Sequence, residues 1–392
     1  MPSRRRPLVR TLTVAAAATA LTAACTTGPV AREATTSPPA SPSLRQVPTS
    51  TSPTTSRLPA TPTAPAAAAA RTGPPVTLLT GLDRPWSIAL LPDGSALVGV
   101  RNTAEIHHVP APGSTASATV LGRVPGVVAT GEGGLLGLAI APDFASAPIL
   151  YTYFTSATDN RVAAIPVTDG RLGSPRVILT GIPRARNHNG GRIAFGPDGQ
   201  LYATTGDAGE SRLAQDLTSL GGKILRVTRD GEPAPGNPFG GSPVWSYGHR
   251  NVQGIAWDAR GWMYASEFGT SIWDELNIIR PGGNYGWPAV EGRAGNPDYV
   301  DPIAQWPSSE ASPSGIAIGP DGAVYLAALR GESVWRVPLR PDGSAGTPVR
   351  YLKGTYGRIR DIRFVDGRAW ILTDNGANDR LISLPLSDVG AN

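Results

Sequence analysis

Ile193-Ala-Phe-Gly-Pro-Asp-Gly199 is one of six related phrases that recur along this chain of 392 residues. In the fullest copies, apolar residues lead into a turn where proline presets a negative φ and glycine supplies a positive one. The pattern is typical of a strand that ends in a tight turn. The other five phrases begin at Ile88, Leu138, Ile255, Ile316 and Ile362.

The spacing of the phrases predicts the architecture. Successive copies start 50, 55, 62, 61 and 46 residues apart, and further short apolar segments follow them, such as 201–205 and 223–227. A repeat of about 50 residues with three or four strands is typical of one propeller blade. We therefore expect an all-β, six-bladed β-propeller over residues 73–392. The segment 76–80 is expected to pair into the last blade and close the ring.

The first 72 residues have a different composition. Residues 1–24 combine four arginines with an apolar run that is too short to cross a bilayer, which is typical of a signal peptide. The run ends in Leu21-Thr-Ala-Ala-Cys25, which resembles a bacterial lipoprotein signal. We expect export and a lipid anchor at Cys25 on the outer face of the cell membrane. The alternative is an ordinary secretory signal with a chance cysteine.

The segment that follows the signal, residues 25–72, is rich in Pro, Thr, Ser and Ala and has few large apolar side chains. Such a composition cannot bury enough surface to offset its ordering entropy. It predicts a disordered tether between the anchor and the propeller. The chain has a single cysteine, so no intramolecular disulfide is possible.

The positive charge of the whole chain is misleading about its partners. The formal net charge is +5, but residues 73–392 hold 27 Lys and Arg against 29 Asp and Glu, a net of −2. The excess of arginine lies in the predicted signal and tether. A near-neutral propeller gives no support for nucleic-acid binding, so we expect none.

Polar residues before the predicted inner strands suggest a site, because this part of each blade lies at the mouth of a propeller's channel. His188 and Arg250 both stand five places before their phrases, and Arg358 and Arg360 precede the sixth phrase. Clustered cations predict a polyanionic ligand. The unperturbed pKa of a histidine side chain is about 6.5, which suits a general base. The alternative is that all four are ordinary solvated turn residues.

Seven segments carry a resemblance to a known family. They resemble the soluble pyrroloquinoline quinone (PQQ) dependent glucose/sorbosone dehydrogenases, most closely the aldose sugar dehydrogenase branch, which are six-bladed propellers. In order, the segments are 131–137 (GEGGLLG), 187–192 (NHNGGR), 205–207 (TGD), 248–254 (GHRNVQG), 274–277 (DELN), 282–288 (GGNYGWP) and 358–361 (RIRD).

The resemblance implies a function and a set of roles. PQQ and Ca²⁺ would bind at the channel mouth, and an aldose would be oxidised at C1, with the electrons passed to an external acceptor. His188 would take the proton of the C1 hydroxyl while hydride passes to C5 of the quinone, beside Arg250. The implied cofactor contacts are Glu132, Arg250, Asn251, Arg330, Arg358 and Arg360. The implied Ca²⁺ ligands are the backbone carbonyls of Gly269 and Thr270.

Four positions depart from the family pattern. Asn187 stands where glucose-specific members have an acid beside the base, Glu132 replaces a glutamine, Phe268 replaces a polar residue and Thr270 replaces a proline. A second, structural calcium near Glu291 is a weaker expectation.

Two other functions stay open at this point. One is a metal-dependent lactonase of the gluconolactonase type that uses Glu132, Asn251 and Asp374 as ligands. The other is a non-catalytic propeller that binds a wall glycan or a protein.

Overall fold

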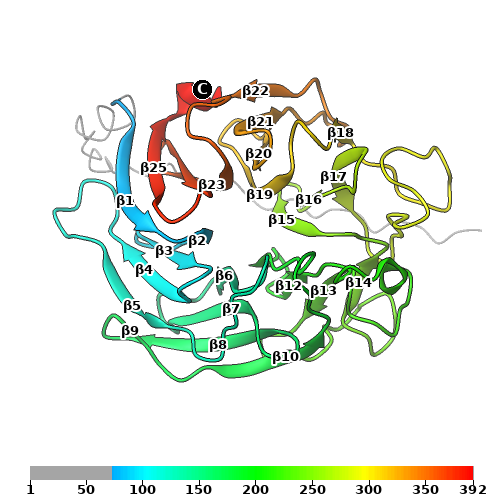
Figure 1. Ribbon diagram of the computed structural model, residues 1–392, viewed down its shortest axis with the longest axis horizontal. Coiled ribbons are helices and arrows are strands. Elements are labelled where there is room, and N and C mark those ends of the chain that lie inside the picture. The colour runs from blue at the N-terminus through cyan, green and yellow to red at the C-terminus, as the bar shows by residue number, and fades with distance from the viewer. Residues whose placement is uncertain (1–72, 392) are drawn as a thin grey trace, which may run out of the picture. The chain divides into compact units, whose positions relative to one another are not determined.

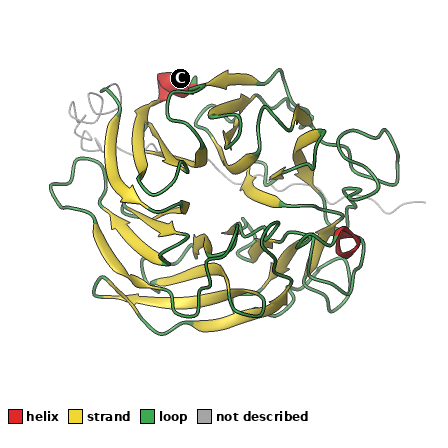
Figure 2. Cartoon of the chain, viewed as in Figure 1, coloured by secondary structure: helices red, strands yellow, loops and turns green. Residues whose placement is uncertain are grey.

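The computed structural model describes residues 73–391 as six β-sheets arranged around a central axis (Figures 1 and 2). The all-β, six-bladed propeller is therefore confirmed. The only helices in this part of the chain are two 3₁₀ turns, η1 (Ser211–Ala214) and η2 (Leu386–Val389). Neither has the length or the apolar run needed to cross a membrane. The predicted signal peptide, the Cys25 anchor and the tether lie outside the described residues.

The first three blades follow one another in sequence. Blade 1 contains β2 (Pro85–Leu90), β3 (Ala96–Val100), β4 (Glu105–Val109) and β5 (Thr119–Arg123). Blade 2 contains β6 (Leu135–Ile140), β7 (Ile149–Thr155), β8 (Asn160–Thr168), a short β9 (Arg171–Leu172) and β10 (Arg176–Ile182). Blade 3 contains β11 (Ile193–Phe195), β12 (Leu201–Thr204), β13 (Lys223–Val227) and β14 (Val244–Tyr247).

The last blade closes the ring. Blade 4 contains β15 (Val252–Trp257), β16 (Met263–Glu267), β17 (Trp273–Ile279) and β18 (Ala304–Pro307). Blade 5 contains β19 (Pro313–Ile318), β20 (Val324–Ala328), β21 (Ser333–Val337) and β22 (Val349–Tyr351). Blade 6 contains β23 (Ile359–Val365), β24 (Arg368–Thr373), β25 (Asp379–Pro385) and, as predicted for closure, β1 (Val76–Leu82).

The recurring phrases form the innermost strands β2, β6, β11, β15, β19 and β23, each of which contacts its two neighbours around the ring. These strands come so close together that only glycine fits at three points. A Cβ on Gly137 would lie 2.2 Å from the Gly191 carbonyl oxygen, and one on Gly254 would lie 2.3 Å from that of Ser314. Gly315 is likewise blocked, by Asp361. Each of the three glycines stands directly before its phrase.

Antiparallel pairing within each blade places the site. The first residues of an inner strand lie opposite the last residues of the second strand, as in Pro85↔Val100, Val252↔Glu267 and Ile359↔Thr373. Residues that follow the second strand therefore reach the same mouth of the channel as residues that precede the first one.

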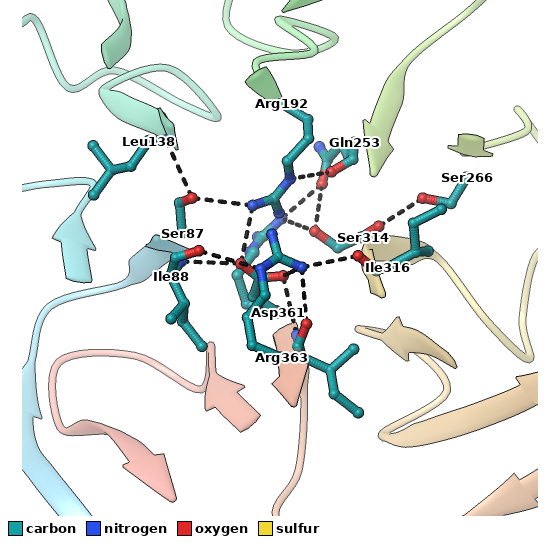
Figure 3. Close-up of polar contacts among 12 residues, drawn as sticks. Ser87, Ile88, Leu138, Arg192, Gln253, Ser266, Ser314, Ile316, Asp361 and Arg363 are labelled. Carbon is teal, nitrogen blue, oxygen red and sulfur yellow. Dashed lines mark hydrogen bonds and ion pairs between the residues drawn. The ribbon is translucent and has the colours of Figure 1, made fainter. Parts of the chain in front are cut away.

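A buried polar network crosses the axis of the ring (Figure 3). Arg192 of blade 3 and Asp361 of blade 6 form an ion pair at 3.0 Å, with both side chains almost fully buried. The Asp361 carboxylate also accepts the Ile88 N–H at 3.0 Å. Arg192 donates to Ser87 Oγ at 3.1 Å and lies over the Trp86 ring at 4.2 Å. One network thus joins blades that are far apart in sequence.

Replacing Arg192 with Met is expected to destabilise the propeller strongly. It leaves the buried Asp361 charge without its partner from blade 3, and breaking a buried pair on one side costs about 3–5 kcal/mol. The free energy of unfolding in urea measures the loss. The control is Arg176→Met, which breaks the exposed pair with Asp230, and its expected cost is below about 1 kcal/mol. Equal losses in the two variants would contradict the central role of the axial pair.

Candidate active site

Two adjoining polar cavities open at the mouth predicted from the sequence. One measures about 330 Å³ and the other about 230 Å³, and they share Glu132, Phe268, Leu329 and Arg358 in their walls. The larger is also lined by Arg84, Trp86, Arg101, Gly131, Gln253, Arg360 and Asp374. The smaller is also lined by His188, Arg250, Gly269, Thr270, Asp274, Ser308, Ser312 and Arg330. A separate apolar cavity of about 500 Å³ lies among the opposite ends of the inner strands.

His188 is held between two carboxylates in the smaller cavity. Its Nδ1 lies 2.7 Å from Asp207 Oδ1, and its backbone N–H donates to Glu132 Oε2 at 2.9 Å. His188 also adopts a φ of 55°, a left-handed conformation that costs a residue with a side chain about 1–2 kcal/mol. Such strain, stabilised by the surrounding contacts, is common at functional sites.

Asp207 is the partner of His188, a role that the sequence analysis did not assign to it. It follows β12, receives the Trp287 Nε1–H at 2.8 Å on its other oxygen, and is almost fully buried. Burial alone would raise the pKa of Asp207, but its hydrogen bonds, first of all to His188, hold the pKa below its usual value. The ionised carboxylate therefore accepts the Nδ1 proton, which leaves Nε2 as the free nitrogen.

Arg250 lines the same cavity, and Glu267 holds its backbone in place. Its backbone N–H donates to Glu267 Oε1, while Glu267 Oε2 pairs with His249 Nδ1 at 2.8 Å. His249 is fully buried, contacts Ser246 Oγ at 2.9 Å through Nε2 and stacks on Tyr285. The Arg250 guanidinium lies 5.5 Å from the Trp287 ring centre, and its Nε is buried without a partner among residues 73–391. Arg250 thus has hydrogen-bonding capacity left for a ligand.

Asp374 organises the cations of the larger cavity. It accepts Arg84 Nη1 at 3.2 Å and forms a close ion pair with Arg360, while Arg358 Nε donates to the Asp374 carbonyl at 3.1 Å. Although burial opposes ionisation, the charge of Arg360 holds the pKa of Asp374 below its usual value. Arg360 is only 5% exposed and also donates to Gln253. Its guanidinium is therefore more completely engaged than the sequence analysis expected.

The loop after β16 lines the smaller cavity with Gly269 and Thr270. Gly269 donates its N–H to Asp274 at 3.0 Å, and Glu291 Oε1 accepts four consecutive N–H groups from Thr270 to Trp273. Within the described chain, no donor reaches the carbonyl oxygens of Gly269 and Thr270. Free carbonyl oxygens are ligands that Ca²⁺ prefers, so this loop fits a calcium ion. One carboxylate oxygen of Glu291 thus holds the backbone of this loop in place. The second calcium expected near Glu291 stays a prediction.

The remaining predicted residues are placed differently from one another. Glu132 lines both cavities, and Arg330 is exposed at the rim, where Nη1 lies 3.3 Å from the Ser308 carbonyl. Asn251 lines neither cavity: it is fully buried, and its Oδ1 accepts the Gly190 N–H at 3.0 Å. Asn251 therefore supports the loop that carries His188, and the cofactor contact expected of it stays a prediction.

The charge of the two cavities fits an anionic ligand. Their walls hold six arginines against three carboxylates, those of Glu132, Asp274 and Asp374. Burial raises the pKa of Asp274 to about 6, so this carboxyl loses its negative charge more readily than an ordinary aspartate as the pH falls. A site with such a cationic excess suits a polycarboxylate such as PQQ.

Comparison with known proteins agrees with this geometry. The Glucose / Sorbosone dehydrogenase family profile matches residues 82–383. An aldose sugar dehydrogenase of Escherichia coli strain K12 is 32% identical, over 76% of this chain and 90% of that protein. The PQQ-bound structure of the aldose sugar dehydrogenase from Streptomyces coelicolor is 51% identical, covers 79% of this chain and 96% of its own, and superposes with a TM-score of 0.76.

Another relative matches a shorter part of the chain. The quinoprotein glucose dehydrogenase B of Acinetobacter calcoaceticus is 33% identical, over 57% of this chain and 54% of that protein. The family profile spans most of the propeller, from β1 to β25. Fold, ordered motifs and profile lead to one conclusion: this chain is a member of the glucose/sorbosone dehydrogenase family.

Proposed function

We propose that the protein is a PQQ-dependent aldose sugar dehydrogenase that oxidises aldoses at C1 to lactones and passes the electrons to an external acceptor. The observation that carries this proposal is the oriented His188–Asp207 pair, which faces a cavity shared with Arg250. The PQQ-bound structure of the Streptomyces coelicolor relative supports the choice of cofactor.

His188 is the general base in this proposal. The carboxylate of Asp207 holds the Nδ1 proton, so the Nε2 lone pair is free to accept the proton of the C1 hydroxyl. The same carboxylate stabilises the imidazolium that forms. Asn187, where glucose-specific members have an acid, therefore does not leave the base without a carboxylate, because Asp207 supplies one from the end of β12.

The other polar residues bind and orient. When bound, PQQ would supply the two-electron acceptor for the sugar, with Ca²⁺ as a Lewis acid beside it. Arg250, Arg330, Arg358 and Arg360 would hold its anionic groups. The carbonyls of Gly269 and Thr270 would hold Ca²⁺.

The lactonase alternative loses its ligands. The three groups it requires are engaged elsewhere: Glu132 accepts the His188 N–H, Asn251 accepts the Gly190 N–H, and Asp374 pairs with two arginines. A binding propeller needs no strained base with a buried carboxylate behind it. Neither alternative accounts for the His188–Asp207 pair.

We also propose that the chain is exported and anchored by lipid at Cys25, on the strength of the N-terminal pattern. Cells that express the full-length chain and are fed labelled palmitate should incorporate label, and the Cys25→Ser variant should not. Label in both, or in neither, would contradict the anchor.

Replacing His188 with Ala is expected to abolish sugar-dependent dye reduction by the full-length chain supplied with PQQ and Ca²⁺. Loss of a general base costs about 10²–10⁴-fold in rate. His108→Ala is the control, because His108 contacts Ser95 in blade 1 and lines neither cavity. This variant should retain activity with a panel of aldoses. The proposal fails if the unaltered protein neither binds PQQ nor changes the PQQ absorption spectrum when sugar is added. Lactone hydrolysis with metal alone would support the lactonase.

Asp207→Asn is expected to lower kcat by about 10²–10⁴-fold, because an amide N–H facing Nδ1 would move the imidazole proton to Nε2. PQQ affinity should stay close to that of the unaltered protein, since Asp207 does not line the cavities. Asp216→Asn, in the same loop but at an exposed turn, is the matched control. Steady-state kinetics and PQQ titration together test the assignment, and an unchanged kcat would show that Asp207 does not orient the base.

A further inference from the structure

Arg101 is a buried cation without a counter-charge. It directly follows β3, lines the larger cavity and is only 8% exposed. Its Nε lies 3.3 Å from the Asn102 side chain, and no carboxylate in residues 73–391 comes within ion-pair distance of its guanidinium. Its terminal nitrogens are therefore available to something that enters the cavity.

The neighbouring arginines are in a different situation. Arg84 and Arg360 both pair with Asp374, and Arg192 below them pairs with Asp361. Arg101 gains only longer-range attraction from Asp374 and Glu132.

The environment of Arg101 disfavours its charge in the absence of a ligand. Burial, and then the repulsion of Arg360, lower its pKa to about 10. A buried charge is costly unless it is paired. A buried cation that lacks an ion-pair partner is a candidate for ligand binding, where an incoming anion would supply the partner.

Arg101 reaches the cavity from a different blade than the other arginines proposed to bind the cofactor. It belongs to blade 1, whereas the cofactor contacts implied by the family resemblance lie mainly on blades 4 to 6. The chain around Arg101 also contacts the loop of Glu132, since the Arg101 carbonyl accepts the Leu135 N–H at 3.1 Å. Glu132 in turn holds the backbone of His188. Arg101 therefore lies near Glu132, which contacts the backbone of the base, and also near the cluster formed by Arg360 and Asp374.

We propose that Arg101 forms a carboxylate-binding subsite on blade 1, which a carboxylate of the cofactor or of an acidic aldose such as a uronic acid occupies. This inference rests on the proposed function, which supplies both kinds of carboxylate. A guanidinium suits the role because its parallel N–H groups match the two oxygens of a carboxylate.

The experiment compares Arg101→Gln with Arg101→Lys in the full-length chain. Arg123→Gln is the matched control, because Arg123 lies on the same blade with its side chain 67% exposed. Three quantities are measured: PQQ affinity by tryptophan fluorescence, the Tm without ligand and with D-glucuronate, and the ratio of kcat/KM for D-glucuronate to that for D-glucose.

Arg101→Gln should leave the Tm without ligand unchanged or raised, because it removes an uncompensated charge. If the cofactor supplies the carboxylate, PQQ affinity falls by about tenfold or more. If the sugar supplies it, PQQ affinity holds and the glucuronate-to-glucose ratio falls by about tenfold or more. In either case Arg101→Lys should recover part of the loss, since it restores the charge without the planar fork.

Two results would overturn the subsite. The first is PQQ affinity and a sugar ratio both within about twofold of the unaltered protein, a change too small for a lost charged contact. The second is a Tm without ligand that falls well below that of the Arg123→Gln control, which would make Arg101 a structural residue.

Failure of the proposed function has a separate signature. In that case the unaltered protein itself does not bind PQQ. The Tm shift caused by D-glucuronate, compared between the unaltered protein and Arg101→Gln, then decides alone: a shift lost in the variant supports the subsite, and no difference overturns it.

Discussion

The carboxylate of Asp361 lies where the inner strands of the ring converge, and its geometry constrains the whole propeller. It accepts N–H groups from Ile88 in blade 1 and from Ile362 in its own blade, and it pairs with Arg192 from blade 3. Arg363, also paired with Asp361, donates to the Ile316 carbonyl of blade 5. The buried charge of Asp361 is thus satisfied by groups from blades 1, 3 and 6, and Arg363 links the same network to blade 5. The polar site above it and the apolar cavity below it are separated by this network.

Much of the fold was predictable because its cause is local and repeated. Proline and glycine define the turn after the inner strands of blades 1, 3 and 5, as the positive φ of Gly94, Gly199 and Gly322 bears out. The spacing of the phrases then predicts the number of blades, and the segment left over at the start supplies the closing strand. The axial network was not predictable in this way, because Arg192 and Asp361 are 169 residues apart and nothing in the local pattern pairs them.

Part of the site was predictable from the sequence, and the pairing of the strands explains which part. Searching before each inner strand led to His188, Arg250, Arg358 and Arg360. That search does not reach Asp207, Arg101 or Asp374, which follow the second strands β12, β3 and β24. In the sequence analysis, Asp207 appeared only within the segment 205–207 and Asp374 only as a lactonase ligand. Antiparallel register carries both sets of residues to one mouth of the channel. The available signal was therefore positional: in each blade, the residues just after the second strand belong in the same search.

The placement of the acids explains how the site stays cationic. Asp207 pairs with His188, Glu267 holds the backbone of Arg250, and Asp374 pairs with Arg360 in the wall of the larger cavity. Each of these carboxylates contacts and orients a neighbouring residue. Most of the arginines in the cavity walls therefore have no carboxylate partner within residues 73–391 and can bind an anionic ligand. Groups held in this way need little rearrangement when an anion or a developing charge arrives, which is the condition for effective electrostatic stabilisation. The same arrangement keeps an excess of positive charge in the walls of the two cavities, and the Arg192–Asp361 pair joins blades 3 and 6 near the axis of the ring.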